Sequence, residues 1–200
     1  LGANIKVCGP PTLIPKYINE LGIGVEYDVK KASEELNRIL NLNKMNTTSI
    51  GLNKQEAENL TVSLNDLLAN IQIYYQSLRG LHCNIKGKSF FELHVKFEEF
   101  YTDSQEKIDF IAERILTLGG APLHTFKDYS ELAKVPVGKN ISNDVEGVQL
   151  VVHSLSELLK IERSILNEAN KANDEGTNTM MSDFIAEQEK TIWMLNAWLN

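Results

Sequence analysis

The sequence has few of the residues that build disulfide-stapled or membrane-embedded proteins. Its two cysteines, Cys8 and Cys83, do not form a CxxC pair, so a disulfide framework or a CxxC-type zinc or redox motif is excluded. No apolar run approaches the roughly 18 residues that a membrane-spanning helix needs. The first residues lack the charged and apolar regions of a secretory signal peptide. We therefore expect a protein of the reducing cytoplasm, without a membrane partner.

An excess of positive charge is also missing. The formal net charge is −7, and from Met45 onward 14 basic residues stand against 22 acidic ones. The chain ends on Trp198, Leu199 and Asn200, without a basic tail. Proteins that bind nucleic acid neutralise phosphates with lysine and arginine, so we expect no direct DNA binding.

The first 44 residues predict a short α/β-like appendage. Strand-like residues 4–8 and 25–27 alternate with two helical segments, which end near residues 22 and 42. Two strands and two helices bury little surface and leave sheet edges open. We expect residues 1–44 and 45–200 to be separate parts of the chain. Whether the first part is a native fusion, an unstructured extension or an extraneous addition stays open at this stage.

The remaining residues predict an all-α fold with four long helices. Apolar residues recur at helical spacing in each of them, and Ser89 is the expected N-cap of the second. Between the second and third helices lies a long connection with at most one helical turn, near Tyr129. A long crossover at this place is typical of a ferritin-like four-helix bundle. The expected helices span residues 54–81, 89–118, 145–173 and 179–199, with a turn at 174–177.

Histidines and carboxylates gather on the first two predicted helices. His82 is followed by His94, Glu98, Asp109 and Glu113, and this mixture of imidazole and carboxylate suits transition metals. His94 shares a helix face with Glu98, as Asp109 does with Glu113. His94 and Asp109, however, would lie about 22 Å apart along a continuous helix. Either the helix breaks between them, or another subunit completes each half-site.

These residues also have plainer interpretations. A helical histidine is often only a packed or surface residue, and Asp109 and Glu113 could form a solvated helix face. The nearby aromatic residues most simply belong to the core: Phe90, Phe91, Phe97, Phe100 and Tyr101. The metal interpretation is favoured because all the candidate ligands occur together within one four-helix pattern.

Five short motifs stand out between Met45 and Leu199: His82-Cys83-Asn84, Gly87-Lys88-Ser89-Phe90-Phe91, Leu93-His94, Asp109 with Glu113-Arg114, and residues 187–195 of the last helix. Through these motifs the sequence resembles the Dps family, the ferritin-like DNA-binding proteins from starved cells. The resemblance implies a di-iron ferroxidase site at a two-fold interface. His82 and His94 of one subunit would face Asp109 and Glu113 of the other, with Glu98 as an additional acidic ligand.

The resemblance also implies a function. The protein would oxidise Fe(II), preferably with hydrogen peroxide, and store ferric mineral in a hollow homo-dodecamer built from two-fold dimers. It would thereby protect DNA from oxidative damage, in the cytoplasm or associated with the nucleoid. The alternative is a structural shell or metal-binding protein without ferroxidase turnover.

Three further positions matter to this interpretation. Asp174 and Asp183 are candidates for the acidic three-fold pores of the family, although each could simply be a turn or helix-start residue. Cys83 stands where the family motif has tryptophan, beside a ligand histidine.

Residues 1–33 contain the run GPPTLIP at 9–15, followed by ELG at 20–22. Through these residues the segment is similar to a fragment of an aspartate carbamoyltransferase. The carbamoyl-phosphate domain of that enzyme is absent, so we expect no transcarbamoylase activity. A transcarbamoylase-related regulator is the weaker alternative.

Overall fold

The computed structural model describes residues 31, 33–39 and 46–200. The chain divides into two units, Leu1–Met45 and Asn46–Asn200. In the first unit, residues 31 and 33–39 are helical, within the helix that the sequence predicts up to about residue 42. The strands predicted at residues 4–8 and 25–27 lie outside the described residues.

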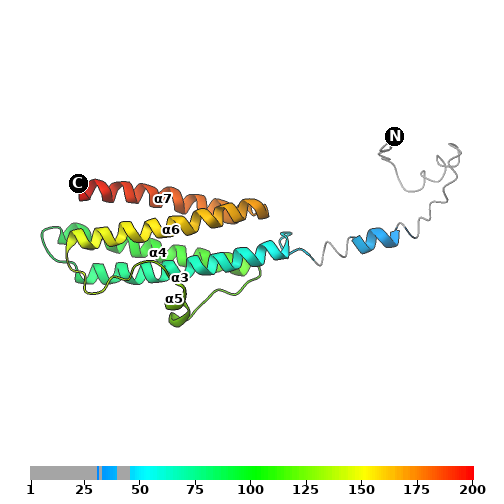
Figure 1. Cartoon of the computed structure of the whole chain (residues 1–200), viewed down its shortest axis with the longest axis horizontal. Helices are drawn as coiled ribbons and strands as arrows, with labels where there is room; N and C mark the ends of the chain where they lie inside the picture. The colour runs from blue at the N-terminus through cyan, green and yellow to red at the C-terminus, as the bar shows by residue number, and fades with distance from the viewer. Residues whose placement is uncertain (1–30, 32, 40–45) are drawn as a thin grey trace. The chain divides into compact units, whose positions relative to one another are not determined.

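The second unit is helical, as predicted (Figure 1). Over residues 46–200 the β pairing is confined to one isolated bridge between Thr47 and Asn53. None of the helices in the described residues combines the length and apolar character that a membrane crossing requires. The helices are α3 (Lys54–Asn84), α4 (Phe90–Thr117), α5 (Phe126–Leu132), α6 (Asp144–Ala172) and α7 (Glu175–Leu199).

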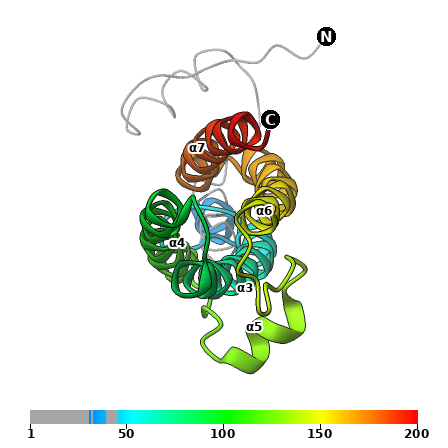
Figure 2. The same ribbon diagram turned by 90° about the vertical axis from the view of Figure 1, so that its left-hand side faces the viewer.

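Four of these helices surround a common axis, and the short α5 lies outside them, beside α3 (Figure 2). The α3–α4 and α6–α7 connections are short, so each pair is antiparallel. A Cβ atom at Gly147 would contact Leu81, Ile85 and Phe97, which places the start of α6 where α3 ends and α4 begins. Because α4 and α6 thus run in the same direction, the connection between them must cross the length of the bundle. This is the predicted ferritin-like topology.

The crossover is attached along α3 by buried and half-buried polar side chains. Near its beginning, Asn65 donates to the carbonyl of Ala121 and accepts from the backbone of Leu123. Further along, the buried Asn70 accepts from the backbone N–H groups of Lys134 and Val135 at 2.7 and 3.1 Å. Backbone N–H groups in a loop have no partners in a helix or sheet, and these side-chain oxygens accept from them instead. The long loop therefore has one defined path.

The core between the helices consists mainly of leucine and isoleucine side chains, and Phe97 is also fully buried in it. Burying each one contributes roughly 1.5–3 kcal/mol. Several large apolar side chains do not join this core; among them, Phe91 is 82% exposed and Val62 is 71% exposed. The prediction of a core position for Phe91 is therefore wrong; it sits in the first turn of α4. The largest fully buried side chains include Leu60, Leu64, Leu67, Leu78, Phe97, Ile111, Ile115, Leu158 and Ile165.

The last helix begins four residues earlier than predicted, at Glu175 rather than Thr179. Asn173 adopts the left-handed conformation, with φ of 54°, and its side chain tolerates this conformation better than most. Asp174 then caps α7 by accepting a hydrogen bond from the backbone N–H of Thr177 at 3.1 Å. Two residues therefore suffice to turn the chain, where the sequence pattern predicts four.

Candidate metal centre

The two candidate histidines meet at the reversal between α3 and α4. His82 is in the last turn of α3, and His94 is in the second turn of α4. Between them Gly87 has a φ of 108°, which a side chain would strain. The imidazole rings stack with their centroids 3.8 Å apart and their planes 23° apart. The predicted pairing of these two residues is thus present within a single chain.

Each histidine is held by the backbone of the other. His82 donates from Nδ1 to the carbonyl oxygen of His94 at 2.8 Å, and His94 donates from Nδ1 to the carbonyl oxygen of His82 at 2.9 Å. A carbonyl oxygen only accepts, so both Nδ1 atoms must carry the proton. In the neutral rings, Nε2 keeps its lone pair. This orientation by a backbone carbonyl is typical of metal-ligating histidines.

Aromatic side chains pack around the two imidazoles. Phe90 stacks on His94 with a centroid distance of 5.0 Å, and Tyr101 meets His82 edge-on at 5.5 Å. Partial desolvation, followed by the charge and hydrogen bonding of Glu98, raises the pKa of the Tyr101 phenol. Glu98, which follows His94 by one turn of α4, is therefore close to Tyr101. The place of Tyr101 next to the site was not predicted, although its spacing from Glu98 along the helix is a signal that could have found it.

The candidate acids are on the same helix but far from the histidines. The helix α4 is continuous over 28 residues, from Phe90 to Thr117, so the alternative of a break between His94 and Asp109 is wrong. A separation of about 22 Å along the helix axis remains. Asp109 and Glu113 are both exposed. Within the described part of the chain, no three histidine, cysteine, aspartate or glutamate side chains converge to hold a metal.

The residue after Glu113 connects α4 to the start of α7. Arg114 donates from Nε to the hydroxyl of Thr177 at 2.9 Å and forms an ion pair with Asp174. This ion pair is largely removed from water, which strengthens it as long as both partners stay bonded. It fixes the helix segment that presents Glu113 to the surface.

The two pore candidates have different surroundings. The Asp174 side chain is 2% exposed and is used as the cap of α7 and the partner of Arg114. This is the helix-start role that the sequence left open. Asp183 is exposed on α7 and lines a groove of about 570 Å³ between α4 and α7, together with Glu113. The pore role of both residues stays a prediction.

Comparison with known proteins agrees with this architecture. Residues 62–200 match the family model of the ferritin-like domain. A "DNA protection during starvation protein" from Porphyromonas gingivalis is 40% identical over 148 residues, which are 74% of this chain and 93% of the relative.

Solved structures are similar as well. The Dps protein from Vibrio cholerae O1, described as a member of a broad superfamily of ferritin-like diiron-carboxylate proteins, is 49% identical. Its TM-score is 0.76, with 78% of this chain and 98% of that chain covered. A Listeria innocua Dps in which two histidines are replaced by glycine is 28% identical, with a TM-score of 0.68 over 70% of this chain and 93% of that one. By sequence, by fold and by the motif that carries its paired histidines, the chain belongs to the Dps family of ferritin-like proteins.

Proposed function

We propose that the protein is a ferroxidase and iron-storage protein. It oxidises Fe(II), preferably with hydrogen peroxide, at sites between subunits and keeps the ferric product as mineral in a hollow dodecamer. Family membership supports this function in outline. The names of its relatives, which refer to DNA protection during starvation, and the diiron-carboxylate description of the Vibrio cholerae protein point the same way.

The observation that carries the proposal is the division of the candidate ligands into two half-sites. His82 and His94 form one, with Glu98 nearby, while Asp109 and Glu113 form the other on the same straight helix. A single chain cannot bring the halves together. A two-fold axis would do so, because it places the acidic half of one subunit against the histidine half of the next.

The surface of α4 supports such a pairing. Two large apolar side chains, Phe91 and Val95, are exposed beside His94. Two more, Phe110 and Leu116, are exposed beside the acidic half-site. Apolar side chains that are exposed together often mark protein–protein contact surfaces. The face of α4 that carries both half-sites is therefore the face that a second subunit would cover.

The spacing of the histidines provides a further argument. The two replaced histidines of the Listeria innocua variant are 12 positions apart in that protein, which is the spacing of His82 and His94. Nitrogen ligands bind Fe(II) well, whereas carboxylates favour the harder Fe(III) product. A site with two imidazoles and a few carboxylates would thus bind the substrate ion and release the product towards the mineral.

The reaction balances without an added reductant. Two Fe(II) ions supply two electrons to one hydrogen peroxide, which takes up two protons and leaves as two water molecules, and two Fe(III) ions result. Two-electron reduction avoids the hydroxyl radical that a single Fe(II) would generate. The negative charge of residues 45–200 disfavours direct DNA binding. Removal of iron and peroxide would protect DNA without such binding. A salt-sensitive gel shift with purified protein would contradict this part.

The activity test compares two histidine substitutions. His94→Ala removes a ligand, whereas His153→Ala, on the exposed face of α6, removes a histidine outside the site. We expect His94→Ala to lower the rate of Fe(II) oxidation by peroxide by about tenfold or more and His153→Ala to leave it unchanged. The rate is followed by the absorbance of the ferric product. Equal rates for wild type and His94→Ala would favour a shell without ferroxidase turnover.

A further inference from the structure

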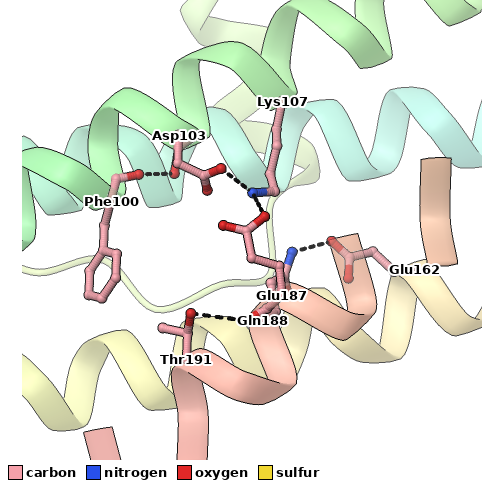
Figure 3. Close-up of polar contacts among 8 residues, drawn as sticks. Phe100, Asp103, Lys107, Glu162, Glu187, Gln188 and Thr191 are labelled. Atoms are coloured by element: carbon pink, nitrogen blue, oxygen red, sulfur yellow. Dashed lines mark hydrogen bonds and ion pairs between the residues drawn. The ribbon is translucent and has the colours of Figure 1, made fainter. Parts of the chain in front are cut away.

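A polar cluster around Lys107 lies inside the bundle, between α4, α6 and α7 (Figure 3). Lys107 is 5% exposed, and its ammonium group pairs with Asp103, one turn earlier on α4, and with Glu187 of α7 at 2.7 Å. The next residue of α7, Gln188, donates from Nε2 to Glu162 Oε1 of α6 at 2.5 Å. Consecutive residues of α7 therefore contact two different helices.

The contact between Glu162 and Gln188 is chemically incomplete. Glu162 is 0% exposed and Gln188 is 4% exposed, so the pair is shielded from solvent. Glu162 Oε2 and Gln188 Oε1 have no hydrogen-bond partner, and among the residues that the structure describes they are the two buried side-chain atoms in this condition. Buried polar atoms without partners are rare in native proteins and call for an explanation.

The two atoms are the complementary halves of one missing hydrogen bond. A carboxylate oxygen and an amide oxygen both only accept, so an ionised Glu162 cannot bond to Gln188 Oε1. A protonated carboxyl group, however, has an O–H donor that an amide oxygen can accept. One proton on Glu162 Oε2 would therefore give both atoms a partner, beside the bond that Gln188 Nε2 already donates. The result is an acid–amide pair with two hydrogen bonds.

Other ways to satisfy the two atoms are less complete. A cavity of about 20 Å³ beside Gln188 has room for about one water molecule. Gln188 lines this cavity but Glu162 does not, so a water molecule there would leave Glu162 Oε2 without a partner. Exchanging the nitrogen and oxygen of the Gln188 amide would place two acceptors against each other at Glu162 Oε1. A proton on Glu162 is the simplest arrangement that serves both side chains.

The charged surroundings of Glu162 come from several helices. Lys107 of α4 and Arg163 of α6 favour its ionised form, whereas Glu187 of α7 favours the neutral form. From α3, Tyr74 lines the cavity beside the pair, and burial raises the pKa of its phenol, so it stays neutral. Burial outweighs the nearby positive charges and raises the pKa of Glu162 to about 7. An O–H bond to the amide exists only in the neutral form and therefore acts in the same direction.

We propose that Glu162 keeps its proton in the folded subunit and donates it to Gln188 Oε1, so that this acid–amide pair is a pH-sensitive latch between α6 and α7. While Glu162 is neutral, two hydrogen bonds close the latch. When Glu162 loses its proton at alkaline pH, a carboxylate oxygen faces the amide oxygen, and the two acceptors repel each other. The segment of α7 around Gln188 then loosens from α6. The latch does not depend on the function proposed above.

Infrared spectroscopy of the full-length assembled protein tests for the proton. A protonated carboxyl group has a carbonyl stretching band that carboxylates and amides lack. The difference spectrum between wild type and Glu162→Gln at about pH 6 should contain this band, which should disappear as the pH is raised to about 9. Glu146→Gln, an exposed glutamate of the same helix, is the matched control and should reveal no such band. Absence of the band from the wild type would overturn the proposal.

Gln188→Met tests for the partner of the acid. Methionine has a side chain of similar length and removes both amide groups. Both hydrogen bonds of the pair weaken the carbonyl bond of Glu162, so their loss should move its band to higher frequency. Gln188→Ala serves for the same comparison if Gln188→Met does not assemble. A band at the same frequency with and without the amide would contradict the acid–amide pair.

Hydrogen exchange of the α7 backbone, followed by mass spectrometry, tests the latch itself. After correction for the intrinsic effect of pH, peptides around Gln188 should exchange about tenfold faster in wild type at about pH 9 than at about pH 6. Glu162→Gln has no proton to lose at this position and should be equally protected at both pH values. Equal protection of the wild type at both values would show that no latch opens.

Discussion

At the scale of single residues, each histidine keeps its hydrogen-bond acceptor when the other is changed to alanine, and what it loses is the stacking contact between the two rings. Each ring donates to a backbone carbonyl of the other residue, and an alanine at either position keeps that carbonyl. His94→Ala therefore leaves the acceptor for His82 in place. A loss of activity in this variant reports the missing ligand rather than a collapsed neighbour.

Cys83 is the residue at which the sequence departs from the family motif. Its side chain is exposed, and the thiol is free. We predict that Cys83→Trp leaves the amount of iron bound per site unchanged, because the proposed ligands are other residues. Iron content after loading with Fe(II) is the measurement, with His82→Ala as the control that lowers it. A large change in iron bound to Cys83→Trp would make Cys83 part of the site.

Glu162 predicts a dependence of stability on pH. Its pKa is about 7 in the folded chain and 4.5 without the burial. Because the folded chain favours the neutral carboxyl, Glu162 contributes most to the free energy of unfolding below about pH 4.5. This contribution is lost as the pH rises through about 7. Its upper limit is about 3 kcal/mol. Glu162→Gln cannot ionise. Relative to wild type, it should gain stability between pH 5 and pH 8.5.

Urea unfolding midpoints at a fixed protein concentration measure this difference, since the assembly makes stability depend on concentration. Glu58→Gln, an exposed glutamate of α3 changed in the same way, is the matched control. If the urea midpoints of Glu162→Gln and wild type differ by the same amount at every pH in this range, Glu162 is not held neutral by burial.

The cluster around Lys107 illustrates what the sequence does not reveal at this scale. Lys107, Glu162 and Gln188 lie on three different helices, and each looks like an ordinary helix-surface residue in its own segment. Only the rotation of α4, α6 and α7 about their axes turns them towards one another. By contrast, His82 and His94 were predicted because their spacing belongs to a family motif.

At the scale of the helices, the start of α7 depends on a close approach to α4. A Cβ atom at Gly176 would lie 2.8 Å from Arg114 Nη1, too close for van der Waals contact. Gly176→Ala should therefore displace the guanidinium group from Asp174. The lost charge-assisted bonds outweigh the helix propensity of alanine, and we predict a net loss of about 1 kcal/mol.

Thr179→Ala, an exposed change one turn later on α7, is the control and should be neutral or slightly stabilising. Thermal unfolding of both variants at equal protein concentration distinguishes them. A Gly176→Ala variant as stable as Thr179→Ala would show that Arg114 can move at no cost.

The four long helices could be predicted because each has apolar residues at helical spacing and ends at recognisable signals. The lack of proline or glycine between Phe90 and Thr117 also indicates that α4 is unbroken. The early start of α7 was missed because a left-handed Asn173 and a capping Asp174 shorten the turn. The exposure of Phe91 could not be predicted from a single chain, because periodicity does not distinguish a core face from a face that a second subunit covers.

At the scale of the whole molecule, assembly is a condition of the proposed chemistry. One subunit holds a histidine half-site at one end of its bundle and an acidic half-site further along α4. An isolated subunit would contain every ligand and still lack a complete site. The oligomer is thus part of the catalytic design rather than only a container for the mineral.

Mixed assemblies test this claim most directly. One parent protein carries His82→Ala and His94→Ala, and the other carries Asp109→Asn and Glu113→Gln; neither can form a complete site alone. In a two-fold pair with one subunit of each kind, one of the two sites has all its ligands intact. Random co-assembly should therefore restore about a quarter of the wild-type peroxide-driven Fe(II) oxidation. Co-assembled protein no more active than its two parents would contradict a site shared between subunits.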